Sequence, residues 1–97
     1  METLTEILLP VDDRESGEWL LYPNPTADRL HIVPAYSGNL IIHMLDLNGR
    51  LMIEQRRFVT LGNAFTLDCQ DFITGTYILE LRTPENRILL TRKVLME

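Results

Sequence analysis

The amino-acid sequence predicts an all-β protein with an Ig-like antiparallel β-sandwich of about seven strands. Apolar residues alternate with polar ones over short segments, and no segment carries the apolar stripe of an amphipathic helix. Turns that contain glycine or proline separate these segments. The 97 residues are enough for one domain, and a closed barrel is the less favoured alternative.

The strands are expected where the alternation is clearest. In 39–47 apolar residues occupy both faces, which predicts a strand buried on one face and partly covered on the other. In 76–82 the residues Tyr77, Leu79 and Leu81 form one apolar face. The complete set of expected strands comprises residues 18–22, 29–34, 39–47, 50–59, 64–69, 76–82 and 87–95.

The turns and the last strand give further expectations. Asn48-Gly49 lies between two apolar runs and predicts a hairpin with a type I′ turn, in which both central residues have positive φ. Pro23 and Pro25 cannot donate ladder hydrogen bonds, so the chain is expected to leave the sheet there. The last strand, 87–95, is apolar on both faces, which a β-bulge would reconcile. Its exposed edge would offer self-association or pairing with a partner.

Charge is distributed unevenly along the chain, whose net charge is −5. Residues 1–28 contain seven acidic residues and one basic residue, whereas residues 29–97 contain seven acidic and eight basic residues. We therefore expect residues 1–17 to form an acidic linker or an extra edge strand, and residues 18–97 to form the folded domain. The acidic balance argues against nucleic-acid binding.

The sequence contains no run of about 18 apolar residues, so no membrane-spanning helix is expected. The N-terminus lacks the basic and apolar regions of a signal peptide. We expect that the protein either stays inside the cell or is part of a longer precursor.

Few residues are of the types that carry catalysis or bind metal. His31 and His43 are expected within strands without converging ligands, which does not make a metal site. Cys69 is the single cysteine and is expected to be a small buried apolar residue. No phosphate-binding loop or nucleophile elbow is present. The sequence therefore predicts a binding or carrier module that is not an enzyme and has no cofactor or metal.

Four short motifs follow one another along the chain. They are Tyr22-Pro23-Asn24-Pro25, Asp46-Leu47-Asn48-Gly49-Arg50, Gly75-Thr76-Tyr77, and a final strand with Lys93 near its end. In this order and spacing they resemble the C-terminal sorting domains, type A, of the type IX (Por) secretion system of Bacteroidetes. The resemblance covers Trp19 to Glu97, about four fifths of the chain.

The resemblance implies a non-catalytic secretion signal. Such a domain directs a cargo protein from the periplasm across the outer membrane. The implied partners are the outer-membrane translocation machinery, which recognises the folded sandwich, and a sortase-like processing protease, which cuts the preceding linker. The cargo is then released outside the cell or attached to its surface.

The first motif and the end of the chain have expected roles within this resemblance. Pro23 and Pro25 would fix an extended segment after the first strand. Asn24 is expected to bind its own backbone in an Asx turn. Lys93, the only lysine, is expected to contact a receptor as a flexible point charge.

The two central motifs have structural roles as the main expectation. Gly49 and Gly75 would supply backbone conformations that other residues disfavour, and Arg50 follows Gly49 in the hairpin. Tyr77 would bury its ring and need a partner for its hydroxyl. Because sandwich folds host many functions, an Ig-like adhesion or ligand-binding accessory module is the alternative function.

Overall fold

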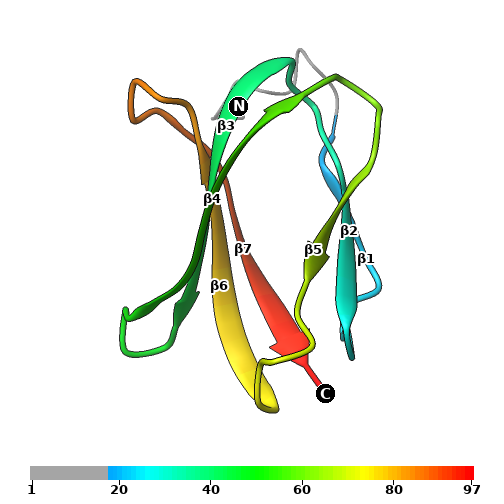
Figure 1. Ribbon diagram of the computed structural model, residues 1–97, viewed down its shortest axis with the longest axis vertical. Helices are drawn as coiled ribbons and strands as arrows, with labels where there is room; N and C mark the ends of the chain where they lie inside the picture. The colour runs from blue at the N-terminus through cyan, green and yellow to red at the C-terminus, as the bar shows by residue number, and fades with distance from the viewer. Residues whose placement is uncertain (1–17) are drawn as a thin grey trace, which may run out of the picture.

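Seven β-strands make up the ordered framework of residues 18–97, the part of the chain that the computed structural model describes (Figure 1). The strands are β1 (Leu20–Tyr22), β2 (Arg29–Val33), β3 (Gly38–Asp46), β4 (Leu51–Val59), β5 (Phe65–Asp68), β6 (Gly75–Arg82) and β7 (Ile88–Met96). All seven predicted strands are confirmed, with ends that differ by two residues or fewer. The linker or edge strand expected at 1–17 lies outside the described residues.

The strands pack as two antiparallel sheets. One sheet has the order β1-β2-β5 and the other has the order β4-β3-β6-β7. Lettered along the chain as A, B, C, C′, E, F and G, they form the A-B-E and C′-C-F-G sheets of an Ig-like sandwich. The predicted fold class is therefore confirmed. Within residues 18–97 no helix is long and apolar enough to cross a membrane.

The core lies between the two sheets, where alternate residues of each strand point inwards. Leu30 and Ile32 of β2 and Ile42 and Met44 of β3 are fully buried in one apolar cluster. On β3, Ile41 is also buried although it points to the opposite face, as the apolar residues on both faces predicted. Removal of these side chains from water is the main favourable contribution to folding.

The last strand contains the predicted bulge. Leu81 pairs with Leu90 and Arg82 pairs with Ile88, so Leu89 is an extra residue in β7. The bulge shifts the alternation, and Leu89 and Val94 are both buried as a result.

The outer edge of β7 is covered at its C-terminal end. The N–H of Thr26 donates to the carbonyl of Leu95 at 2.9 Å, and the N–H of Glu97 donates to the carbonyl of Thr26 at 2.8 Å. These bonds make a parallel bridge between Thr26 and Met96. The expectation of an exposed terminal edge is wrong here, because the loop between β1 and β2 folds back onto this edge.

Candidate functional site

The carboxylate of Asp46 holds the β3–β4 hairpin together. Its Oδ1 atom accepts hydrogen bonds from the backbone N–H groups of Asn48 and Arg50, each at 2.9 Å, and Nε of Arg50 lies 3.3 Å from Oδ2. The backbone hydrogen bond from Arg50 is the main cause that lowers the pKa of Asp46, and it outweighs the opposing effect of desolvation. Asp46 therefore stays ionised at neutral pH and ties the whole turn to β3.

The turn is not the predicted type I′ turn. The N–H of Gly49 donates to the carbonyl of Asp46 at 3.0 Å, and the N–H of Asp46 donates to the carbonyl of Arg50 at 2.9 Å. Gly49 has φ +85°, whereas Asn48 is not among the residues with positive φ. The hairpin is thus a three-residue loop with a type I turn followed by one left-handed residue. This form brings the N–H groups of Asn48 and Arg50 onto one carboxylate, which a two-residue loop does not do.

The β6–β7 hairpin repeats this design with different residues. The N–H of Asn86 donates to the carbonyl of Thr83 at 2.8 Å, and the hydroxyl of Thr83 accepts from the N–H of Arg87 at 3.2 Å. Asn86 has φ +72° and stands where Gly49 stands in the first hairpin. Asparagine tolerates this conformation better than most residues other than glycine. Asn86 was therefore the sequence signal from which this second hairpin turn could have been predicted.

Tyr77 holds the loop that leads into β6. Its side chain is 4% exposed, and its hydroxyl donates to the carbonyl of Ile73 at 2.9 Å. Its ring also meets the ring of Phe72 edge to face, with centroids 4.9 Å apart. Gly75 lies between these contacts with φ +157°, a value that other residues rarely adopt. The predicted burial of Tyr77 and the need for a hydroxyl partner are confirmed.

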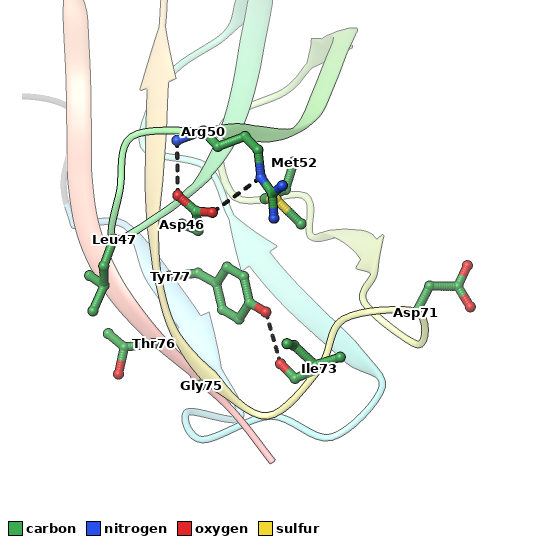
Figure 2. A pocket seen from close by; sticks show the side chains of 9 residues that line it. All are labelled: Asp46, Leu47, Arg50, Met52, Asp71, Ile73, Gly75, Thr76 and Tyr77. Carbon is green, nitrogen blue, oxygen red and sulfur yellow. Dashed lines mark hydrogen bonds and ion pairs between the residues drawn. The ribbon is translucent and has the colours of Figure 1, made fainter.

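The hairpin and the loop face each other across a groove of about 360 Å³ (Figure 2). Six of its lining residues belong to the two central motifs: Asp46, Leu47, Arg50, Gly75, Thr76 and Tyr77. The remaining lining residues are Met52, Asp71 and Ile73. Figure 2 shows the Asp46–Arg50 pair on the hairpin side and the Tyr77–Ile73 bond on the loop side.

Asn24 does not form the predicted Asx turn. Its Oδ1 atom accepts a hydrogen bond from the N–H of Leu95 at 3.1 Å, and its Nδ2 atom donates to the carbonyl of Lys93 at 3.3 Å. The side-chain amide therefore binds β7 as the backbone of a neighbouring strand would. Thr26, which the sequence did not single out, is buried and continues this pairing through its backbone.

One transverse row across the four-stranded sheet brings the motifs together. Asp46 pairs with Tyr77, and Tyr77 pairs with Val94, in register on β3, β6 and β7. At one end of the row Asn24 binds the residues of β7 on both sides of Val94. At the other end the carbonyl of Arg50 accepts a hydrogen bond from the N–H of Asp46. In Figure 1 this row lies at the lower end of the sandwich, with the β3–β4 turn and the C-terminus. We call this the motif end.

The other predicted site residues lie outside the groove. Lys93 is exposed and pairs with Ile78, so its side chain points away from the face that Val94 and Tyr77 share. Tyr22 is exposed and packs its ring 5.1 Å from that of His31. Pro23 and Pro25 lie in the loop after β1, as expected, and both follow cis peptide bonds.

A group of charged residues on the outer face of the same sheet was not expected. Nε2 of His43 lies 3.1 Å from Glu54, and Nδ1 lies 3.8 Å from Glu80. Arg82 in turn binds Glu80. These residues meet because β4, β3 and β6 place them in register, which no local pattern reveals.

Within residues 18–97 no group of His, Cys, Asp and Glu side chains is placed to hold a metal ion. Cys69 is fully buried, as predicted. Burial raises the pKa of its thiol, and the nearby carboxylates of Asp68 and Asp28 add to this effect. A thiol in this state is a poor nucleophile.

Comparison with known proteins gives one match. A family model for a secretion system C-terminal sorting domain matches residues 20–97, which include the motif end. Neither a curated protein nor a solved structure matches the chain.

Proposed function

The chain belongs to the family of secretion system C-terminal sorting domains, and from this membership we propose that it directs a cargo protein across the outer membrane by the type IX route. The family is a sorting signal for type IX secretion and not a class of enzymes. A sorting signal of this kind sends its cargo to the cell surface or the extracellular space. The domain is of type A, comes from a member of the Bacteroidetes, and passes through the periplasm with its cargo.

The proposed recognition surface is the motif end. The observation that supports it is the shared groove, in which residues from two distant motifs meet while a third motif, at Asn24, anchors the neighbouring strand. Leu47 is 68% exposed and Ile73 is 79% exposed on the two sides of this groove. Exposed apolar side chains gathered at one place are typical of protein contacts.

The groove is well suited to recognition because its walls are preorganised. Asp46 fixes the hairpin wall through three contacts. Tyr77 fixes the opposite wall through the hydrogen bond from its hydroxyl to the carbonyl of Ile73. This surface therefore loses little conformational entropy when a partner binds to it. The translocation machinery in this proposal inserts an apolar side chain between Leu47 and Ile73.

Processing and attachment are further parts of the proposal. The sortase-like protease cuts within residues 1–17, which precede the sandwich, and the cargo is then released or attached to the cell surface. Lys93 contributes a separate contact to a receptor, since its ammonium group is exposed on the outer face of the sheet.

The proposal is tested with the 97-residue chain fused behind a fluorescent protein that carries a general secretion signal. In a host with type IX machinery we expect fluorescence in the medium or at the cell surface. Retention of this fusion in the periplasm, while the host's own cargo is exported, overturns the proposed function.

Variants locate the recognition surface within that experiment. Leu47→Glu and Ile73→Glu are expected to reduce export about tenfold, because each places a charge at the rim of an apolar contact. Leu61→Glu is the matched control, since Leu61 is 50% exposed in the turn after β4, at the other end of the sandwich. Equal export of all three folded variants contradicts the motif end as the recognition surface.

Lys93→Ala tests the separate contact in the same assay. The side chain of Lys93 is exposed, so the thermal unfolding midpoint is expected to stay unchanged while export falls. Normal export of this folded variant contradicts a receptor contact by Lys93.

A further inference from the structure

Within residues 18–97, β4 is the one nine-residue sheet edge that no other segment covers at any point along its length. It forms the end of the four-stranded sheet and pairs only with β3. The edge strands of the other sheet, β1 and β5, have three and four residues, whereas β4 has nine. The opposite edge, β7, is covered at its C-terminal end by Asn24 and Thr26. A long uncovered edge is a template for pairing with another strand.

The side chains of β4 provide only part of the usual protection against such pairing: the strand carries Glu54, Arg56 and Arg57 and a bulge near its start. The strand contains no lysine and no proline, and Phe58 is 70% exposed. Arg57 points inwards, because it pairs with the buried Leu40. Its guanidinium lies 4.9 Å from the centroid of the Phe65 ring of β5, although Arg57 remains exposed to solvent. An inward-pointing charge of this kind opposes pairing only at its own position near the end of the strand. The bulge at Met52 disturbs only the start of the strand.

We propose that β4 pairs antiparallel with β4 of a second copy, around a two-fold axis at Gln55. Antiparallel pairing around this residue places Glu54 of each copy opposite Arg56 of the other, which makes two cross-strand pairs of opposite charge. It also places the exposed Phe58 opposite the exposed Met52, at the point where the bulge begins. Opposite charges and apolar residues in facing positions stabilise a strand pair.

Neighbouring registers are less favourable. An axis at Glu54 places two glutamates opposite each other, and an axis at Arg56 does the same with two arginines. Directly opposed like charges destabilise a strand pair. The pattern of β4 therefore selects one isologous register, as a symmetric dimer requires.

The resulting dimer has one continuous eight-stranded sheet, because each copy contributes its four-stranded sheet. Since β4 begins at the motif end and the pairing is antiparallel, the two grooves lie at opposite ends of the dimer. The inference is independent of the proposed function.

The proposal is tested by measuring the oligomeric state of the 97-residue chain with sedimentation velocity, at protein concentrations from about 10 μM to 1 mM. The wild type is expected to shift from monomer to dimer over this range. Arg56→Glu and Glu54→Arg are each expected to weaken the dimer about tenfold or more, because both symmetry-related pairs become like-charged. Glu54→Arg also removes the contact of Glu54 with His43 of its own chain, so the thermal unfolding midpoint of each variant is measured alongside. The double variant that carries both changes restores opposite charges and is expected to dimerise within about threefold of the wild type.

Two controls separate pairing from other effects. Arg87→Glu makes the same charge change as Arg56→Glu at an exposed residue of the β6–β7 hairpin, and it is expected to leave the dimer unchanged. Circular dichroism confirms that every variant is folded. A wild type that stays monomeric at 1 mM, single variants that dimerise as well as the wild type, or a folded double variant that stays weakened each overturns the proposal.

Discussion

Asn24 binds Leu95 across 71 positions of sequence, through a 3.1 Å hydrogen bond from the backbone N–H of Leu95 to Oδ1 of Asn24. The same side chain donates to the carbonyl of Lys93. A single amide thus occupies the edge of the C-terminal strand and links the first motif to the last. The geometry gives the first motif a structural role that is separate from contact with a partner.

Asn24→Ala is expected to lower the free energy of unfolding by about 1–2 kcal/mol, because two hydrogen bonds to β7 are lost. The amide of Leu95 should also exchange its hydrogen faster. Urea unfolding and hydrogen exchange measure the two effects. Asn63→Ala, in an exposed turn, is the control and is expected to change stability by less than about 0.5 kcal/mol. An unchanged exchange rate at Leu95 contradicts the role of Asn24.

Tyr77→Phe keeps the buried ring and removes the hydroxyl that binds Ile73. The carbonyl of Ile73 loses its partner, so we expect a loss of about 1 kcal/mol in urea unfolding. Tyr22→Phe is the matched control, since Tyr22 is exposed, and its stability should stay within about 0.5 kcal/mol of the wild type. Equal stability of both variants argues against a role for the Tyr77 hydroxyl in holding the loop.

Gly49→Ala tests the left-handed residue of the hairpin. A Cβ atom at Gly49 meets no heavy atom within 4 Å, so its cost is conformational. We expect a loss of about 1 kcal/mol for alanine and a smaller loss for Gly49→Asn, because Asn86 adopts this conformation in the second hairpin. Thermal unfolding measures the difference. An asparagine variant no more stable than the alanine variant contradicts this explanation.

Asp46 makes stability depend on pH. Because its pKa is lower in the folded state than the ordinary value of 3.8, it stabilises the fold above that value, and this stability is lost as the pH falls through the lowered pKa. Asp46→Asn removes this contribution. Below about pH 4 the melting temperature of the variant should therefore fall less steeply than that of the wild type. If the melting temperatures of the wild type and the variant change in parallel from pH 2 to pH 7, Asp46 is excluded as a source of the pH dependence.

Cys69 is expected to be unreactive in the folded protein. Its thiol is buried and its pKa is raised, so little thiolate is present or accessible at neutral pH. Reaction with an aromatic disulfide reagent should be at least about a hundredfold slower in buffer than in concentrated urea. Similar rates in the two solvents contradict the burial of Cys69.

Strand positions were predictable because their signals are local. Alternating residues such as Tyr77, Leu79 and Leu81 bury one face of a strand wherever that strand lies in the sheet. The hairpin at Gly49 was predictable for the same reason, although its turn type was not. That type depends on how the Asp46 carboxylate reaches two N–H groups, which the residue types alone do not specify.

The sequence by itself determined the strands, the inward faces and the bulge in the last strand, since each depends on residues close together along the chain. It also determined the family, through the order and spacing of four short motifs. Only the tertiary structure decided that Asp46, Tyr77 and Val94 share one row, with Asn24 at its end. It also decided that the C-terminal end of β7 is covered while β4 is left open. Strand order and register determine these contacts, and both depend on the packing of the whole chain.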